Sequence, residues 1–485
     1  MSERSNTRDF RPTAVRLTES CGEKVAASVL VKRLATRLYV IICKLDSKLF
    51  NNVICKPRPA VKRLLTFSRT KSAVRTTLSA CIALLNALPT QAVEVSGLLD
   101  LRLATTNARQ SWVNGGLDKT RFDSSGGALR LGQAMVRIEA DLLDAVSAVV
   151  VVSASDDRMG VLDLTEAFLT WRPVPTSPWK TRVRAGAFFP VTSLEIGYDS
   201  VGWTPQNTVS SSAINSWLGE ELRTQGVEIN VSRNGRSIGS PHDFGVTAAL
   251  FAGNDPVGTL LAWRGWSVGD RISGLTESLQ LPDLPVYRAQ GELPDQSRAI
   301  HLFREIDNHL GFYVAGNYAY GGALELAAMH YDNRGDPLVL RSGQYSWRTR
   351  FDHLSLRWRG LGQWEFAAQV LKGDTLMGPS AVHLDYSAWY VLLSHPLGPG
   401  TATLRFDRFG AQERQSDAIR TDPNSEDGQA LALAYHWRIT PALSLVSELL
   451  AVQSDRPARR LNRQASGQAT EQTERSFTAA LRWHF

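Results

Sequence analysis

The chain has 485 residues, a formal net charge of +7 and a pI near 9.3, values that alone would suggest an anionic partner such as nucleic acid. The charge is uneven: of the 54 Lys and Arg and the 47 Asp and Glu, 17 and 5 lie in residues 1–92, so residues 93–485 carry a net charge of −5. Nucleic acid is therefore not expected as a partner. All four cysteines also precede residue 93, which excludes cysteine-based metal sites and nucleophiles from the remainder and fits an oxidising compartment.

The break near residue 92 has the features of an export signal. Arg69, Lys71 and Arg75 form a basic region, residues 78–88 an apolar run too short to span a bilayer as a helix, and residues 89–92 a small-residue exit ending at Ala92. Residues 69–92 are therefore predicted to be a signal peptide. Residues 1–68 are expected to be disordered, or to result from a start codon assigned too early. Residues 93–485 are expected to form the exported domain.

From residue 93 onward the chain contains runs of about ten residues in which apolar and polar side chains alternate. In residues 135–142, for example, every even position is apolar, and the odd positions are Met135, Arg137, Glu139 and Asp141. Residues 363–370 and 431–438 follow the same period of two, which indicates strands with one apolar face. Local pattern alone does not separate a soluble β-sandwich, with this face in a core, from a membrane barrel, with this face toward lipid.

The connections between the runs alternate between short and long. The predicted short turns are residues 143–144, 173–180, 254–258, 321–322, 359–363, 395–400 and 439–442, and the predicted long loops are residues 106–127, 191–224, 271–298, 333–344, 411–427 and 455–475. All thirteen Trp follow residue 92, and several, such as Trp171, Trp179, Trp358 and Trp364, flank short turns. This is typical of a transmembrane barrel with tight periplasmic turns, elaborate extracellular loops and an aromatic belt at the membrane surface.

The chain ends on an alternating strand, residues 477–485, with Phe485 as its last residue. Counting along the chain gives seventeen candidate strands, whereas a barrel with both ends in the periplasm needs an even number. The ambiguity lies near residues 191–226. We predict an all-β fold, an antiparallel transmembrane β-barrel of about sixteen strands, with eighteen as the alternative.

With an export signal, alternating strands without cysteine, unequal loops and a terminal Phe, the chain resembles the outer-membrane porin superfamily. Residues 188–228, after the strand at 182–189, resemble the region that follows the fifth strand in phosphate-selective-type porins. The resemblance implies a bacterial outer-membrane location among membrane lipid, insertion by the barrel-assembly machinery, a homotrimer, and no cofactor, metal or covalent chemistry. It also implies a C-terminal assembly signal, formed by Phe477, Leu481, Trp483 and Phe485.

The resemblance further implies that the loop after residue 189 folds into the lumen and narrows it. Glu195, Asp199, Glu220 and Glu221 would then present carboxylates to the constriction and face arginines of the wall. Helical character in residues 212–222 fits a short helix within this loop. The alternative, in which the loop caps the exterior, stays open.

The polar faces of the strands supply candidate pore-lining residues. Arg182 and Arg184 share one face of their strand, and an arginine at the bilayer midplane costs about 2–4 kcal/mol, so both are expected to point into the lumen. The same alternation of strand faces places further charged residues in the lumen, namely Arg137, Glu139, Arg405, Asp407 and Arg482. Charges of both signs across a constriction would filter solutes by charge and size.

We therefore predict a channel for passive diffusion of small polar or charged solutes. Three lysines and a net charge of −5 beyond residue 92 argue against a dedicated phosphate channel. One rival is an outer-membrane lipase or protease, for which the pairs His383–Asp385 and Asp352–His353 are the nearest candidates, although neither has an evident nucleophile. The other rival is a structural or adhesive barrel with a plugged lumen. The RGD sequence at 334–336 and the acidic residues at 422–427 are read as ordinary loop composition.

Overall fold

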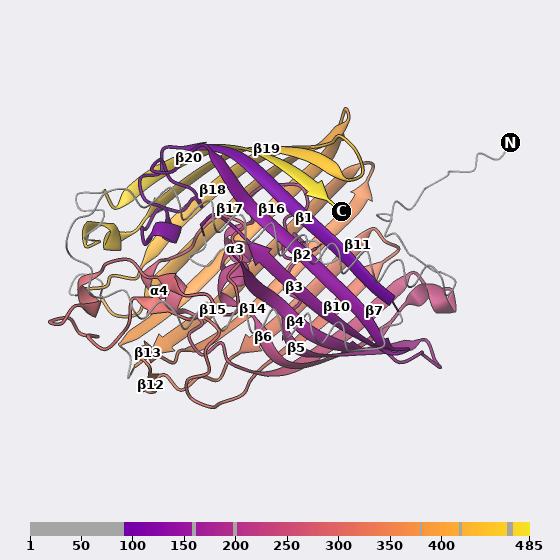
Figure 1. Ribbon diagram of the computed structural model, residues 1–485, viewed down its shortest axis with the longest axis horizontal. Coiled ribbons are helices and arrows are strands. Elements are labelled where there is room, and N and C mark those ends of the chain that lie inside the picture. The colour runs from indigo at the N-terminus through magenta and orange to yellow at the C-terminus, as the bar shows by residue number, and fades with distance from the viewer. Residues whose placement is uncertain (1–91, 158–161, 197–200, 379–380, 417–419, 463–468) are drawn as a thin grey trace, which may run out of the picture. The chain divides into compact units, whose positions relative to one another are not determined.

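The computed structural model describes residues 92–157, 162–196, 201–378, 381–416, 420–462 and 469–485. The predicted N-terminal extension, all but the last residue of the predicted signal peptide, and Asp199 lie outside the described residues. Sixteen strands form one antiparallel sheet that closes on itself (Figure 1). They are β1 (Ala92–Thr106), β2 (Leu129–Leu143), β3 (Val146–Ala154), β4 (Asp163–Trp171), β5 (Trp179–Phe188), β6 (Thr224–Arg233), β7 (His242–Ala252), β10 (Gly311–Tyr320), β11 (Leu324–Asp332), β14 (Arg348–Leu361), β15 (Trp364–Met377), β16 (Val382–Leu397), β17 (Gly400–Glu413), β18 (Glu426–Arg438), β19 (Leu443–Asp455) and β20 (Glu471–His484).

Short elements occupy the connections. They are two small hairpins, β8 (Leu279–Gln280) with β9 (Ala299–Ile300) and β12 (Leu340–Arg341) with β13 (Gln344–Tyr345), the helices α3 (Ala213–Glu221) and α4 (Thr259–Trp263), and the 3-10 turns η1 (Trp112–Asn114), η2 (Gly235–Ile238), η3 (Pro285–Tyr287) and η5 (Pro457–Arg460). None of the helices in the described residues is long and apolar enough to cross a membrane.

The barrel closes where the first strand meets the last. β1 pairs with β20 from Leu98 opposite His484 to Thr106 opposite Ser476. The final residue extends this seam, since Gly97 N–H donates to the carbonyl of Phe485 (2.8 Å) and Phe485 N–H donates to that of Gly97 (3.1 Å). A Cβ at Gly97 would lie 2.0 Å from the Phe485 ring, so glycine is what permits this approach. Closure gives every strand two neighbours and leaves no edge unpaired, which confirms the predicted sixteen strands and shows that eighteen is wrong.

The two rims of the barrel differ as predicted. One rim, here called the short-turn rim, carries residues 144–145, 172–178, 234–241, 321–323, 362–363, 398–399 and 439–442. Of the described residues, the opposite long-loop rim carries 107–128, 155–157, 162, 189–196, 201–223, 253–310, 333–347, 378, 381, 414–416, 420–425, 456–462 and 469–470. β1 starts and β20 ends at the short-turn rim, so an even number of strands returns the chain to the side on which it began.

One predicted short turn was wrong. Residues 254–258 do not join two strands; they begin the connection 253–310 between β7 and β10. The apolar run that follows them forms α4, whose Trp263 is fully buried, instead of a strand. An apolar run inside a packed lumen and an apolar strand facing lipid have similar composition, so the pattern of this run does not separate the two.

The outer wall is apolar. Val183 and Ala185 of β5 lie opposite Ile229 and Val227 of β6 on the outward face. Trp358, Trp364, Trp437 and Trp483 are 40–47% exposed at strand ends beside the short-turn rim. Indole rings are stabilised at the headgroup level of a bilayer, so this wall fits a membrane with its aromatic belt at the short-turn rim.

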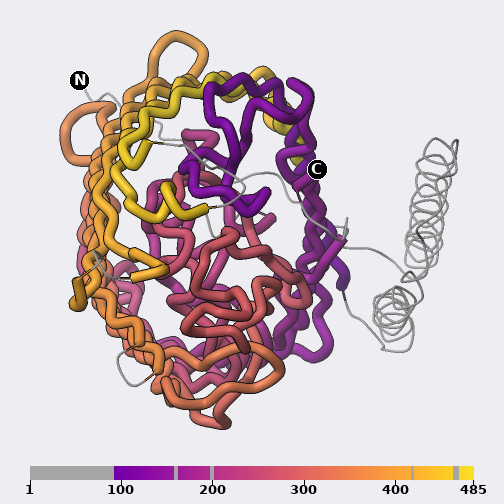
Figure 2. The backbone as a smooth tube through the Cα atoms, turned by 90° about the vertical axis from the view of Figure 1, so that its left-hand side faces the viewer, coloured from indigo at the N-terminus to yellow at the C-terminus, as the bar shows by residue number. Residues whose placement is uncertain are grey.

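Two of the long connections fold back inside the barrel (Figure 2). We call residues 189–196 and 201–223, with α3, the first lumen segment, and residues 253–310, with α4, the second lumen segment. Helix α3 contacts β16 and β17 from the inside. The prediction that the loop after residue 189 enters the lumen instead of capping the exterior therefore agrees with the structure.

Candidate functional site in the barrel lumen

Aromatic side chains attach the lumen segments to one side of the wall. The ring of Trp217 in α3 lies 5.4 Å from Phe351 of β14 and 5.5 Å from Tyr386 of β16, centroid to centroid and nearly perpendicular. Trp266 of the second lumen segment lies 6.1 Å from the same Tyr386. All four side chains are almost fully buried, so this contact resembles the core of a soluble protein and excludes water. We call it the aromatic side of the lumen.

On another part of the wall the contact is ionic. Arg405 of β17 donates to Asp407 Oδ2 (2.9 Å), to Glu195 Oε1 of the first lumen segment (3.0 Å) and to the carbonyl of Ser211 (3.0 Å). Glu448 of β19 accepts hydrogen bonds from the backbone N–H groups of that segment, one of them from Val209 at 2.9 Å. Buried charges require such partners, because desolvation without them is costly.

The second lumen segment reaches the wall through Asp270. Arg102 of β1 donates to both of its carboxylate oxygens, with Nη1 2.8 Å from Oδ1 and Nη2 2.5 Å from Oδ2, and Arg121 Nη1 lies 2.9 Å from Oδ1. Burial opposes ionisation, but Arg102 and Arg121 outweigh it and hold the pKa of Asp270 well below its ordinary value. Arg102 also binds its strand neighbour Asp100, which accepts from Arg482 of β20 at 3.0 Å. We call the wall of β1 and β17–β20 the ionic side of the lumen.

Glu220 and Glu221 occupy the centre of the lumen, but the expectation that they face arginines of the wall was wrong. Glu220 pairs with Arg264 (2.6 Å) and Arg271 (3.3 Å), both in the second lumen segment. Glu221 accepts from Trp217 Nε1 and from the backbone N–H of Leu260 (2.9 Å). Burial raises the pKa of Glu221 to about 7. These carboxylates therefore join the two lumen segments to each other, whereas Glu195 does meet a wall arginine, Arg405.

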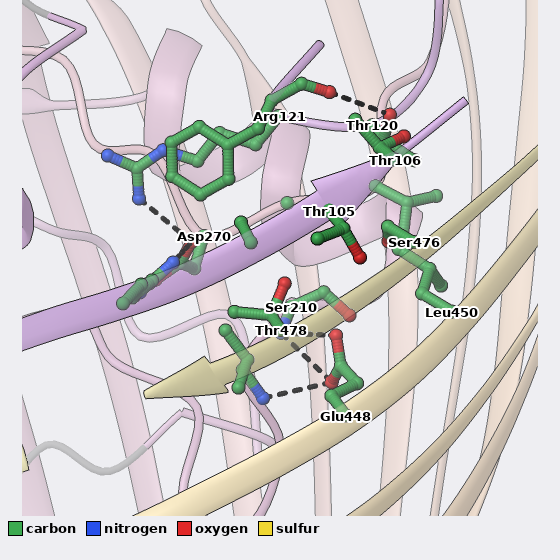
Figure 3. A pocket seen from close by; sticks show the side chains of 16 residues that line it. Thr105, Thr106, Thr120, Arg121, Ser210, Asp270, Glu448, Leu450, Ser476 and Thr478 are labelled. Atoms are coloured by element: carbon green, nitrogen blue, oxygen red, sulfur yellow. Dashed lines mark hydrogen bonds and ion pairs between the residues drawn. The ribbon is translucent and has the colours of Figure 1, made fainter. Parts of the chain in front are cut away.

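A small cavity lies on the ionic side (Figure 3). Its volume is about 30 Å³, room for on the order of two water molecules. Apolar side chains such as Val209, Val268 and Leu450 line it together with hydroxyl-bearing residues and with charged residues, among them Arg102, Asp270 and Glu448. The hydroxyl-bearing residues are Thr105 and Thr106 of β1, Thr120, Ser210, and Ser476 and Thr478 of β20.

Water also reaches charged groups nearer the short-turn rim. The side chains of Arg137 and Glu139, which pair at 2.9 Å, are 24% and 26% exposed. Arg359 is 40% exposed and binds Glu325 (3.0 Å) and Glu365 (2.6 Å) across β11, β14 and β15. We call this inward-facing, partly exposed region the vestibule. Its charged side chains are accessible to solvent on the inward face of the wall.

The predicted wall residues divide between these regions. Arg137, Glu139 and Arg182 lie in the vestibule. Arg184 is 9% exposed, because it binds Glu228 of β6 (2.8 Å) and stacks on the ring of Phe188 (4.1 Å). Arg405, Asp407 and Arg482 face inward but are at most 2% exposed, because the lumen segments cover them. The four residues of the predicted assembly signal, Phe477, Leu481, Trp483 and Phe485, lie outward and are 41–52% exposed.

Sequence reasoning missed several residues of the ionic side. Asp100 and Arg102 alternate with Leu99, Leu101 and Leu103, the same signal that identified Arg182 and Arg184. The alternation of inward and outward side chains along β1 could therefore have identified Asp100 and Arg102. Asp270 lies in an irregular segment, where no periodicity assigns a direction to a side chain.

One carboxylate cluster in the described residues has the spacing of a metal site. Oxygens of Asp255, Glu305 and Asp307 lie within 4.8 Å of one another. The loop's own backbone already uses them, since Gly253 N–H donates to Glu305 (2.7 Å) and Asp307 N–H to Asp255 (3.1 Å). Burial, with the charge of Asp307, raises the pKa of Asp255. Proton uptake thus offers this cluster another way to relieve its repulsion.

The proposed catalytic pairs of the enzyme alternative do not form. Asp352 points outward and binds His330 (2.8 Å), whereas its neighbour His353 points inward and is buried. Asp385 is held by Arg414 through two hydrogen bonds of 2.7 and 2.8 Å. Both histidine–aspartate pairs therefore lack the geometry of an acid–base dyad.

No family model matches the chain, and no curated protein matches it. Among solved structures, the chain is similar to the outer membrane channel DcaP of Acinetobacter baumannii, with a TM-score of 0.48 and 10% identity over 81% of this chain and 97% of that one. It is also similar to the anion-selective porin from Comamonas acidovorans (TM-score 0.46, 14% identity, 81% and 99% coverage). A third is a loop-deletion mutant of OmpT, an outer membrane protein of Vibrio cholerae (0.45, 10%, 81% and 99%).

The chain's own closed sixteen-strand barrel confirms the predicted fold. The finer resemblance to phosphate-selective-type porins stays a prediction.

Proposed function

We propose that this chain is an outer-membrane channel through which small polar or charged solutes diffuse passively, without covalent chemistry. Its closed barrel and apolar wall suit a bilayer, and its lumen carries charges of both signs. The two lumen segments narrow the passage. Solutes pass between these segments and the ionic side of the wall.

The observation that carries this proposal is the unequal attachment of the lumen segments. On the aromatic side they are held by buried rings that no polar solute displaces at low cost. On the ionic side they are held by charged groups and hydrogen bonds beside the small cavity, and a polar solute or water can replace such contacts. Partly exposed charged residues on the inward face, such as Arg137 and Glu139, provide polar groups nearer the short-turn rim.

Ion current across a planar bilayer tests the proposal. The folded protein should conduct, and its reversal potential in a salt gradient should change when Arg182 of the vestibule is replaced by Glu. A folded protein that conducts no ions under any applied voltage would overturn the proposal.

The plugged barrel is the second candidate, and the aromatic side favours it. If the lumen segments never move, the working surface is the long-loop rim. In that case cell-surface binding would depend on the loops, and no bilayer current would be seen.

Location and assembly belong to the same proposal. We expect cleavage after Ala92, insertion into the bacterial outer membrane by the barrel-assembly machinery through the C-terminal strand, and assembly as a homotrimer. N-terminal sequencing of the membrane-inserted form should begin at or near Val93. Recovery of an intact Met1 terminus there would contradict the signal peptide.

A further inference from the structure

The carboxylate of Asp270 sits in a cradle of arginines that belongs to the wall and to a different loop. Arg102 of β1 engages both oxygens, and Arg121, from the connection 107–128, engages one of them. All three side chains are at most 5% exposed. Two parallel N–H donors facing two carboxylate oxygens is the arrangement by which arginine recognises carboxylates specifically.

Asp270 is the member of this cluster that a moving lumen segment would carry away. It belongs to the second lumen segment, and its backbone carbonyl accepts from Gln133 Nε2 of β2 (2.6 Å). Arg102, in contrast, is fixed in the wall, where Asp100 binds its Nε at 2.8 Å. Arg121 is likewise held by Asp157 at 2.7 Å. Departure of Asp270 would therefore leave two guanidinium groups that are still positioned by Asp100 and Asp157, with the N–H donors that faced Asp270 open to another carboxylate.

The cavity of about 30 Å³ adjoins this cradle, and Arg102, Arg121 and Asp270 are among its lining residues (Figure 3). Thr106, Ser476 and Thr478 contribute hydroxyl-bearing side chains to the wall side of the cavity, next to Leu450 and to Glu448, whose carboxylate the backbone of the first lumen segment already binds. Hydroxyl groups both donate and accept, so they suit a solute that itself carries hydroxyls.

We propose that the Arg102–Arg121 cradle binds the carboxylate of a small hydroxylated acid, and that Asp270 is its internal competitor. This inference rests on the proposed channel function and names the class of solute that the channel would favour. Exchange of one carboxylate for another leaves the local charge unchanged, so binding does not expose a bare buried arginine. Asp270, tethered beside the cradle, lowers the apparent affinity for the solute and speeds its release.

The test is equilibrium binding of gluconate to the full-length protein, extracted from membranes and folded in detergent, by titration calorimetry. Asp270→Asn removes the competing charge while keeping the side-chain shape, and gluconate should then bind at least tenfold more tightly than to the unmodified protein. Glu220→Gln is the matched control, because Glu220 is also buried and bound by two arginines but does not line the cavity. It should change gluconate affinity less than twofold.

Three comparisons complete the test. Addition of Arg102→Gln to Asp270→Asn should abolish the gain, glucose should not bind, and inorganic phosphate should bind more weakly than gluconate. Equal affinity of the Asp270→Asn variant and the unmodified protein would overturn the proposal, as would equal binding of glucose, a gain that survives Arg102→Gln, or tighter binding of phosphate.

A failure of the Asp270→Asn variant to fold would also test the proposal. If Asp270→Asn does not give a heat-modifiable barrel, gluconate added during refolding should restore it, because a ligand that binds the folded state stabilises it. Absence of that rescue would overturn the proposal. Bilayer currents of the same preparations distinguish failure of the proposed binding site from failure of the proposed channel. Gluconate binding without ion current would support the site and contradict the channel. Ion current without gluconate binding would support the channel and contradict the site.

Discussion

The aromatic and ionic sides of the lumen hold the same two segments by different interactions: packed aromatic rings on one side, and ion pairs and hydrogen bonds on the other. On the aromatic side, Trp217 and Trp266 pack against Phe351 and Tyr386, and every atom removed leaves a void. On the ionic side, Arg405, Glu195 and their neighbours are matched in charge, and water or a solute can replace a partner. A barrel can therefore anchor an inserted loop through one side of its wall and keep, on the other side, contacts that water or a solute can replace.

Trp217→Ala should have the largest effect, because it removes a buried indole that touches three other aromatic rings. The expected loss is about 3–5 kcal/mol in the packing of the lumen segments. The barrel itself should still form, but limited proteolysis should cut the lumen segments and the bilayer current should rise.

Trp389→Ala is the control for this change, since Trp389 lies on the outward face and is 41% exposed. It should leave proteolysis and current unchanged. If Trp217→Ala were as resistant to protease as the unmodified protein, the aromatic side would not be the anchor.

Arg405→Gln should rank close behind. Loss of one partner from a buried ionic group costs about 3–5 kcal/mol, here softened by water entering from the vestibule. We expect a noisier and larger current with a smaller gain in protease sensitivity than Trp217→Ala produces. Identical effects of the two variants on both measurements would remove the distinction between the sides.

The Glu221 side chain predicts a pH dependence. Its pKa is raised to about 7 in the folded protein from an ordinary value of 4.5, so the packed state favours the neutral form. The packing around α3 should therefore be firmest below about pH 4.5 and weaken as the pH rises through about 7, by ~3 kcal/mol in all.

Hydrogen exchange of α3 at several pH values measures this dependence. Glu221→Gln removes the titrating group, so protection of α3 should become flat between pH 4.5 and 8, at some cost in hydrogen bonding. The same slope in this variant would mean that another group is responsible.

Arg182→Glu should have the smallest effect. Arg182 is about one-third exposed in the vestibule, so reversal of its charge should shift the reversal potential toward cations while the barrel folds normally. Arg184 is a poorer probe than its sequence suggests, because it is buried and binds Glu228 at 2.8 Å, whereas Arg182 is exposed to water and lies 3.5 Å from the same carboxylate. On the outward face of the same strand, Val183→Glu should instead impair insertion, because its carboxylate would meet hydrocarbon.

The inward and outward faces of the barrel wall can be predicted from the sequence, but the packing of the lumen segments cannot. The period of two assigned an inward face to Arg137, Arg182 and Arg405, and the same rule applies to Asp100 and Arg102, which were overlooked. Inside the lumen no such rule exists. Whether Glu220 meets a wall arginine or Arg264 depends on how two irregular segments pack together, and that is a property of tertiary contacts.

The apolar run after residue 258 is a second example of lumen packing that the sequence pattern does not reveal. Leu260, Leu261 and Trp263 are apolar enough for a lipid-facing strand, yet they are buried inside the barrel. Composition alone cannot tell the lipid from a packed lumen. Six buried tryptophans in the connections, at 112, 203, 217, 263, 266 and 347, were the available hint that these loops have a core of their own.

Single-cysteine accessibility under bilayer recording tests the central claim, that solutes pass along the ionic side, most directly. All native cysteines precede residue 93, so a cysteine at Thr478, beside the cavity, can be compared with one at Ala388, on the aromatic side. A charged, water-soluble thiol reagent should block most of the current through Thr478→Cys and leave that through Ala388→Cys unchanged. Block of Ala388→Cys alone, or of neither variant in a conducting barrel, would contradict the account.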